Sequence, residues 1–235
     1  MDPLGVLDAP IPPTSVALNL YERATRSLLR TVRLVVEDVG AFEKAVGIDL
    51  SALSSGAVSY FLDDSDVDWL NRTFDLGIQR EDFYVAVESV DDNHNSPYEI
   101  HTRRELRLML AGTKPLSVFS DVYPADPNPW VFPEDVFLPH VQSGRIIQRE
   151  YTEIPEHPLP SPYRGVRVLI YALAAEVWRI DAYILMRSIA SKSGWHEGFE
   201  RLEGALLGYQ EWQTDVHLQT HGRWWERVPQ VRREG

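Results

Sequence analysis

"VRVLIYALAAEVWRIDAYILM" occupies residues 166–186 and holds both kinds of element from which the fold is built. Residues 166–173 are rich in β-branched and other apolar side chains, which is typical of a buried strand. From Ala174 onward apolar residues recur at helical spacing, so a helix is expected directly after this strand. Three further strands are predicted at 83–90, 115–123 and 145–154. Because helices and strands alternate irregularly, we expect an α+β fold with a mixed or mostly antiparallel sheet of about four strands.

The N-terminal part of the chain is expected to be helical. Residues 1–14 contain four prolines and should form a flexible lead-in. From Val16 to Val39, apolar side chains recur at intervals of three and four, which predicts a long amphipathic helix. We therefore expect residues 15–235 to form a single domain, with a helical part at 15–80 and a sheet with C-terminal helices at 81–235.

The composition narrows the class of protein. The chain has 235 residues and a formal net charge of −12, so it repels polyanions, and nucleic acid is not expected as a partner. It contains no cysteine, which excludes disulfides, thiolate catalysis and thiolate zinc sites. The amino-terminal segment has neither a basic region nor an apolar core, and no apolar run approaches the roughly 20 residues of a membrane span. We expect a soluble, acidic, cytoplasmic protein without a membrane partner.

One carboxylate in the helix after residue 173 needs an explanation. Helical spacing places Asp181 between the apolar residues Val177 and Leu185. A carboxylate on an apolar face is costly unless another group pairs with it. Three roles would account for Asp181: a buried ion pair with an arginine such as Arg167 or Arg104, a general acid or base whose pKa is raised by burial, or a contact with another chain.

A final helix is predicted from Trp195 to Thr220, and with the preceding helix it would form a C-terminal helix pair. Glu203 and His217 lie along the edge of its apolar face. If the two helices pack together, either residue can reach Asp181. A second carboxylate would separate the two pKa values, and a histidine would be oriented as a base. The candidate catalytic residues are therefore Asp181, Glu203 and His217.

Metal binding is not expected. His217 and His221 have the H-x-x-x-H spacing with which two imidazoles on one helix face can bind a metal. However, zinc needs a third protein ligand, and Leu218 stands where the metalloprotease signature has glutamate. The alternating aspartates of residues 64–68 are better explained by helix capping, with Ser65 as the N-cap, than by calcium binding. We expect no metal and no cofactor.

Two groups of side chains are candidates for binding. Four arginines recur at helical spacing opposite the apolar stripe of the predicted N-terminal helix: Arg23, Arg26, Arg30 and Arg33. This basic stripe should face solvent or an anionic partner. Aromatic residues of the two C-terminal helices are candidates for the lining of a cleft: Trp178, Tyr183, Tyr209 and Trp212.

Two functions are compatible with these patterns. The first is a binding or regulatory protein that docks on another macromolecule, with a protein partner or self-association through the predicted 16–39 helix. The alternative is a small acid–base enzyme, a hydrolase or transferase, with its site around Asp181 and the C-terminal helix. The sequence contains no P-loop, no G-x-S-x-G and no G-x-G-x-x-G motif that would decide between them.

Overall fold

The computed structural model describes residues 14–53, 59–89, 97–124, 130–154 and 159–220. The chain divides into two compact units, Met1–Arg103 and Arg104–Gly235. The predicted α+β class is confirmed, because both units combine helices with an antiparallel sheet. The described strands form one sheet of four strands and one of three, rather than a single sheet of about four.

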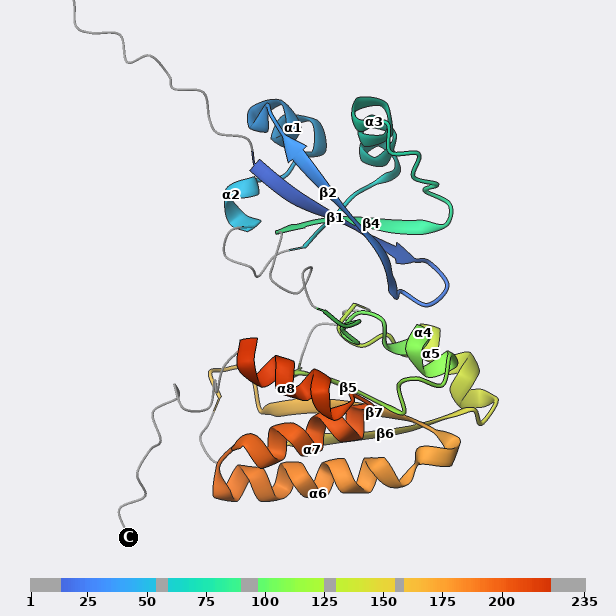
Figure 1. Cartoon of the computed structure of the whole chain (residues 1–235), viewed down its shortest axis with the longest axis vertical. Coiled ribbons are helices and arrows are strands. Elements are labelled where there is room, and N and C mark those ends of the chain that lie inside the picture. Colours follow the sequence, from blue (N-terminus) through green and yellow to red (C-terminus); the bar gives the residue numbers. More distant parts are fainter. Residues whose placement is uncertain (1–13, 54–58, 90–96, 125–129, 155–158, 221–235) are drawn as a thin grey trace, which may run out of the picture. The chain divides into compact units, whose positions relative to one another are not determined.

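Unit 1 is a four-stranded antiparallel sheet in the order β2-β1-β4-β3, with α1 and α3 packed on one face (Figure 1). Its strands are β1 (Thr14–Glu22), β2 (Leu28–Val36), β3 (Tyr60–Phe61) and β4 (Phe83–Ser89). Its helices are α1 (Val39–Val46), α2 (Leu50–Leu53) and α3 (Asp64–Phe74). The core of the unit lies between the sheet and the helices α1 and α3, where Leu18, Phe42 and Leu70 are buried.

The predicted helix from 16 to 39 is wrong, because these residues form mainly the β1–β2 hairpin. Side chains of a strand alternate between its faces, and Val16 and Leu18 of β1 join Leu34 of β2 in the core. The opposite face of β1 is also buried, so six consecutive residues of this strand are inside and the alternation is hidden in the sequence. The predicted helical part at 15–80 therefore contains three strands.

The acidic residues at the start of α3 cap the helix. The Asp63 carboxylate accepts hydrogen bonds from the backbone N–H groups of Ser65 and Asp66, and the Asp66 carboxylate accepts one from the N–H group of Asp63. This reciprocal capping box satisfies donors that have no partner within the helix. The capping interpretation is confirmed, but the N-cap is Asp63 rather than Ser65.

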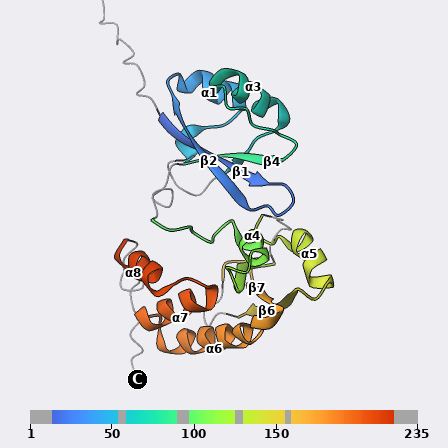
Figure 2. The ribbon, with the colours of Figure 1, turned by 45° about the vertical axis from the view of Figure 1, so that its right-hand side comes forward.

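Unit 2 is a three-stranded antiparallel sheet in the order β5-β7-β6, with helices on both faces (Figures 1 and 2). Its strands are β5 (Leu116–Tyr123), β6 (Ile146–Glu153) and β7 (Gly165–Leu173), close to the predicted ranges. Its helices are α4 (Glu105–Leu110), α5 (Glu134–Gln142), α6 (Trp178–Ser193), α7 (Glu197–Leu207) and α8 (Glu211–Thr220), with the 3-10 turn η2 (Ala174–Glu176) before α6.

The central strand β7 contacts both helical layers. Val168 and Ile170 pack in the cluster that includes α6 and α7, whereas Leu169 and Tyr171 pack in the cluster that includes α4 and α5. Because successive side chains of a strand point to opposite faces, a sheet that is covered on both faces needs apolar residues at nearly every position of its central strand. This explains the nearly continuous apolar run of 166–173.

The C-terminal helices differ from the prediction in one respect. The expected pair is present as α6 and α7, which pack against each other. The single helix predicted from Trp195 to Thr220 is instead divided into α7, which ends at Leu207, and the separate helix α8. The break lies at Gly208, whose φ of 93° is in the left-handed region. A Cβ at this position would lie 2.4 Å from Pro115 Cδ, so the chain here approaches the start of β5 as closely as glycine allows.

Candidate functional site

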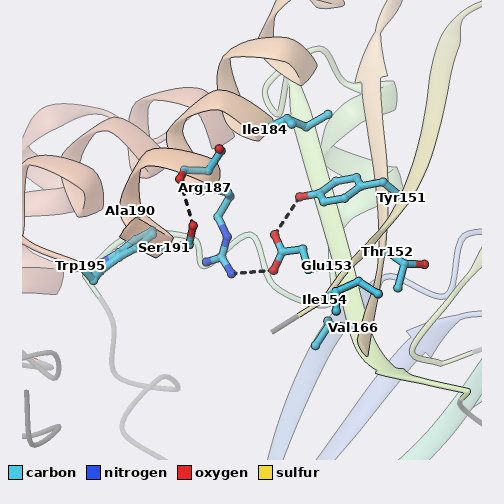
Figure 3. Close-up of a pocket in the computed structure, with 11 residues that line it drawn as sticks. Tyr151, Thr152, Glu153, Ile154, Val166, Ile184, Arg187, Ala190, Ser191 and Trp195 are labelled. Carbon is cyan, nitrogen blue, oxygen red and sulfur yellow. Dashed lines mark hydrogen bonds and ion pairs between the residues drawn. The ribbon is translucent and has the colours of Figure 1, made fainter. Parts of the chain in front are cut away.

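Unit 2 contains a pocket of about 560 Å³ between the end of β6 and the C-terminal half of α6 (Figure 3). We call it the β6–α6 pocket. One part of its lining is apolar and includes Ile154, Val166 and Ile184. The other part carries opposite charges, contributed by Glu153 and Arg187. A concave site with apolar walls and a few polar groups is the usual form of a small-molecule site.

Local structure brings these groups together. Tyr151 and Glu153 are two residues apart near the end of β6, so they point to the same side of the strand, toward α6. On α6, Ile184 and Arg187 are three residues apart and share one face of the helix. Trp195 follows the helix in the connection to α7 and forms the far wall.

A short chain of polar contacts runs along the pocket wall. The Tyr151 hydroxyl donates a hydrogen bond of 3.1 Å to Glu153 Oε1, and Arg187 Nη2 donates one of 3.4 Å to Glu153 Oε2 (Figure 3). The Arg187 guanidinium also lies 5.6 Å from the centre of the Trp195 ring. Within the described ranges Glu153 is the one hydrogen-bond partner of Arg187, so most of the five guanidinium N–H donors remain available.

Behind Arg187 lies a second group of ionisable side chains, on α6, α7 and α8. The Tyr183 hydroxyl donates a 3.1 Å hydrogen bond to Glu203 Oε1. Burial, and next the charge of Glu200, raise the pKa of the Glu203 carboxyl, which favours its protonated form. Glu200 itself lies 3.2 Å from His217 Nε2 and accepts a 2.7 Å hydrogen bond from Trp195 Nε1.

Unit 1 contains a separate polar cluster on the sheet face away from α1 and α3. Its centre is Glu88, whose carboxylate accepts hydrogen bonds from Asn19, Tyr21, Ser59 and Arg103. Asn19 and Glu88 are buried, and each carboxylate oxygen has at least two donors. A buried network with this many satisfied groups is well explained as a structural anchor.

Asp181 does not occupy the predicted position. The buried residues of α6 are Ile180, Tyr183, Met186 and Ala190. The buried face is thus rotated relative to the predicted one, and the Asp181 side chain is 73% exposed. It pairs with Arg149 of β6, not with Arg167, which instead binds Glu134 and Glu150. The prediction of a buried Asp181 is therefore wrong, because an exposed apolar residue such as Leu185 was assigned to the core.

Glu203 and His217 are brought into one neighbourhood, although neither contacts Asp181 through a described ion pair or hydrogen bond. Glu200 and Glu203 lie one turn apart on α7, and Glu200 contacts His217 of α8. Burial and the charge of Glu200 raise the pKa of Glu203, and His217 is the smallest of the influences that partly offset this rise. A catalytic role for these residues stays a prediction.

The four arginines do not form the predicted basic stripe. Arg23 and Arg26 lie at the turn between β1 and β2, where Arg23 donates to the backbone carbonyl of Arg80 and stacks 4.3 Å from the Tyr84 ring. Arg30 and Arg33 lie in β2 three residues apart, so they point to opposite faces of the sheet. The expected single surface is absent because its helix is absent.

The predicted aromatic cleft is also dispersed. Trp178 and Trp212 are about half exposed, and Tyr183 is buried in the core of unit 2. Tyr209 lies after α7, with its ring centre 5.9 Å from Lys114 Nζ. The lining of the β6–α6 pocket includes none of these four side chains.

The residues that do line the pocket were missed by sequence reasoning. Glu153 and Arg187 are 34 residues apart in the chain, and no local pattern marks them as neighbours. Each lies in a correctly predicted element, the β6 strand or the α6 helix, so their meeting depends on how these elements pack. One signal could have identified Arg187: it shares a helix face with Ile184, which was expected in the protein core.

Comparison of the chain with protein-family models, with curated proteins and with solved structures gives no match in any of the three. In the described residues, no helix is both long and apolar enough to cross a lipid bilayer. The same residues contain no group of three or more His, Asp or Glu side chains arranged to hold a metal ion. His221, the partner of His217 in the H-x-x-x-H spacing, lies outside the described residues.

Proposed function

We propose that unit 2 binds a small zwitterion, an amino acid with an apolar side chain, in the β6–α6 pocket. The observation that carries this proposal is the pairing of Arg187 with Glu153 on the pocket wall through one long hydrogen bond of 3.4 Å. The two opposite charges face the same space and hold each other weakly. A ligand with a carboxylate and an ammonium group would replace this bond with stronger ones.

Arg187 is suited to hold the carboxylate. A guanidinium presents its N–H donors as a planar fork that matches the two oxygens of a carboxylate. The guanidinium lies over the Trp195 ring at 5.6 Å from its centre, a cation–π contact that leaves the N–H donors of the fork free to bind. In unit 2, Arg187 is half-buried between the helices and the strand edge, so a bound carboxylate would be partly shielded from water.

Glu153 supplies the complementary acceptor. The Tyr151 hydroxyl fixes one of its oxygens, which leaves the second to accept from a ligand ammonium. Charge argues in the same direction, because a chain of net charge −12 repels a simple anion but not a molecule without net charge. A zwitterion therefore suits the pocket better than a phosphate or a dicarboxylate.

The rest of the pocket accepts an apolar body. Ile154, Val166, Ile184 and the Trp195 ring supply carbon surface beside the charged pair. The volume of about 560 Å³ is within the usual range of small-molecule sites and exceeds that of a single amino acid. An aromatic or branched side chain would bury its surface there, which adds roughly 25 cal/mol for each Å² removed from water.

Calorimetric titration with three matched ligands tests the proposal. L-phenylalanine carries both charges, 3-phenylpropionate lacks the ammonium group and phenethylamine lacks the carboxylate. We expect phenylalanine to bind most tightly, and Arg187→Gln to weaken its affinity by about tenfold or more, as for the loss of a charge-assisted hydrogen bond. Arg149→Gln, on the same sheet edge, is the control and should bind normally. Equal affinity for 3-phenylpropionate, or an unchanged Arg187→Gln, would contradict the assignment.

The contacts give less support to the two functions expected from the sequence than to ligand binding. Macromolecular docking was motivated by the 16–39 helix, and those residues form strands. The acid–base alternative has Glu203, whose pKa is raised, but Glu203 binds Tyr183 and does not line the pocket. Ligand binding is therefore the function that the contacts support best.

A further inference from the structure

We propose that Glu200 is a positioning residue for the β6–α6 pocket, and that α8 influences ligand binding through it. This inference rests on the proposed function, because it concerns the same pocket. Glu200 lies on α7 and does not line the pocket, but its two carboxylate oxygens have different partners, one at the pocket wall and one on α8.

The first partner is the pocket wall itself. Trp195 Nε1 donates a 2.7 Å hydrogen bond to Glu200 Oε2. An indole has a single N–H donor, so this bond fixes the direction in which the ring faces. The same indole ring also lies near Arg187, whose guanidinium is 5.6 Å from the ring centre. A displaced Glu200 would turn the indole and alter both the wall of the pocket and the support of the guanidinium.

The second partner is His217 of α8. Its Nε2 lies 3.2 Å from Glu200 Oε1, and the Glu200 side chain is 13% exposed. Because one small carboxylate contacts both groups, a change at His217 is transmitted to Trp195 through the His217–Glu200 contact and the Glu200–Trp195 hydrogen bond. The route crosses three elements of unit 2, from α8 through α7 to the connection after α6.

Helix α8 packs against α7 mainly through polar contacts, so a change in these contacts can shift its position. Arg201 of α7 binds Asp215 of α8 at 2.7 Å, in addition to the Glu200–His217 contact. The buried residue of α8 is Thr214, which lies close against Gly204 of α7. The partly exposed Arg201–Asp215 pair contributes little and weakens with salt, and in the described residues the core clusters of unit 2 include no side chain of α8, so few apolar contacts hold this helix.

Nuclear magnetic resonance of the indole N–H groups tests this coupling without a ligand. Full-length protein labelled with ¹⁵N gives one indole signal per tryptophan, and Trp195→Phe identifies that of Trp195. We expect Glu200→Ala to shift this signal upfield, as for loss of a hydrogen bond, and His217→Ala to shift it in the same direction by less. Glu200→Gln keeps an acceptor oxygen and should restore most of the signal position. Glu197→Gln, one turn earlier on α7, is the control.

The same variants are then titrated with L-phenylalanine. We expect a loss of affinity of about tenfold for Glu200→Ala, a smaller loss for His217→Ala, and near-normal binding for Glu200→Gln. A Trp195 signal that does not move in His217→Ala overturns the coupling, whether or not Glu200→Ala folds. A signal that moves without any change in affinity overturns the positioning role. If the parent protein does not bind phenylalanine, the proposed function fails, and the indole signal still decides whether α8 is linked to Trp195.

Discussion

At the scale of single residues, Lys114 is the most unusual ionisable group of unit 2. Its side chain is 4% exposed, and it forms no ion pair with any residue in the described ranges. Burial lowers the pKa of its amine to about 8, an effect that Glu105 and Glu203 partly offset. The chain therefore carries an amine that folding makes easier to deprotonate.

Replacing Lys114 with methionine should stabilise the protein at neutral pH. The folded-state pKa of about 8 lies below the ordinary value of 10.5, so the unfolded chain binds more protons between these two pH values. The destabilising effect is full below about pH 8 and disappears as pH rises toward 10.5. The difference corresponds to roughly 3 kcal/mol, an upper bound for the gain of Lys114→Met at pH 7.

Urea unfolding of Lys114→Met at pH 7 and at pH 10 measures this effect. The variant should be more stable than the parent at pH 7, with a clearly smaller advantage at pH 10. The exposed Lys192→Met is the control and should change little at either pH. A gain that is the same at both pH values would show that packing, not charge, is responsible.

At the scale of elements, the sequence predicted the strands that appear as short apolar runs bounded by turn residues. The strands β4 to β7 were located well, because short apolar runs between turn residues have few alternative readings. The β1–β2 hairpin was mistaken for a helix, since burial on both faces of β1 removes the alternation that identifies a strand. The break at Gly208 was missed because it depends on Pro115, almost a hundred residues away in the sequence.

The candidate site was predicted least well, and for a related reason. Glu203 and His217 were predicted on one continuous helix, each as a possible partner of Asp181, and the unpredicted break at Gly208 instead brings both of them near Glu200. The pocket itself depends on how β6 packs against α6. Helix phase was the weak point, since α6 carries apolar residues such as Trp178 and Leu185 on its exposed side, and these masked the true buried face.

Gly208 is the element boundary with the sharpest steric requirement. A Cβ there would lie 2.4 Å from Pro115 Cδ and 3.1 Å from the Thr113 carbonyl oxygen, in a left-handed conformation. Gly208→Ala should therefore destabilise the protein by more than about 2 kcal/mol, from backbone strain plus the clash. Gly47→Ala is a matched control, because Gly47 also ends a helix in the left-handed region, with a φ of 65°, but has no heavy atom within 4 Å of the added Cβ.

Chemical denaturation separates the two contributions. The control should lose about 1 kcal/mol, which is the conformational cost alone. The additional loss in Gly208→Ala then measures how rigidly the end of α7 is held against the start of β5. Equal losses in both variants would mean that the neighbouring chain moves aside.

At the scale of the whole molecule, the two units have separate cores and separate sheets. The Glu88 network belongs to unit 1, and it includes Arg103, the last residue of that unit. Arg103 adopts a left-handed φ of 67°, which is unfavourable for a residue with a side chain. Its contacts with Glu88 and Tyr21 hold the end of the unit in this conformation.

Loss of the Glu88 carboxylate should therefore loosen unit 1 selectively. Glu88→Ala removes the acceptor of the buried Asn19 amide and one acceptor of the Arg103 guanidinium, at a cost of roughly 3 kcal/mol or more. Hydrogen exchange of backbone amides should show weaker protection in β1 and β4, while β5 and β7 keep theirs. The exposed Glu37→Ala is the control. Equal loss of protection in both sheets would mean that the units unfold together.

The burial of Lys114 also determines where amine-directed chemistry can act on the folded chain. The sequence has three lysines, and the other two, Lys44 and Lys192, are exposed. One lies in unit 1 and the other in unit 2. Besides the amino terminus, a fluorophore ester would thus attach once to each unit, without any engineered cysteine. Energy transfer between the two dyes would then follow the separation of the units as phenylalanine is added.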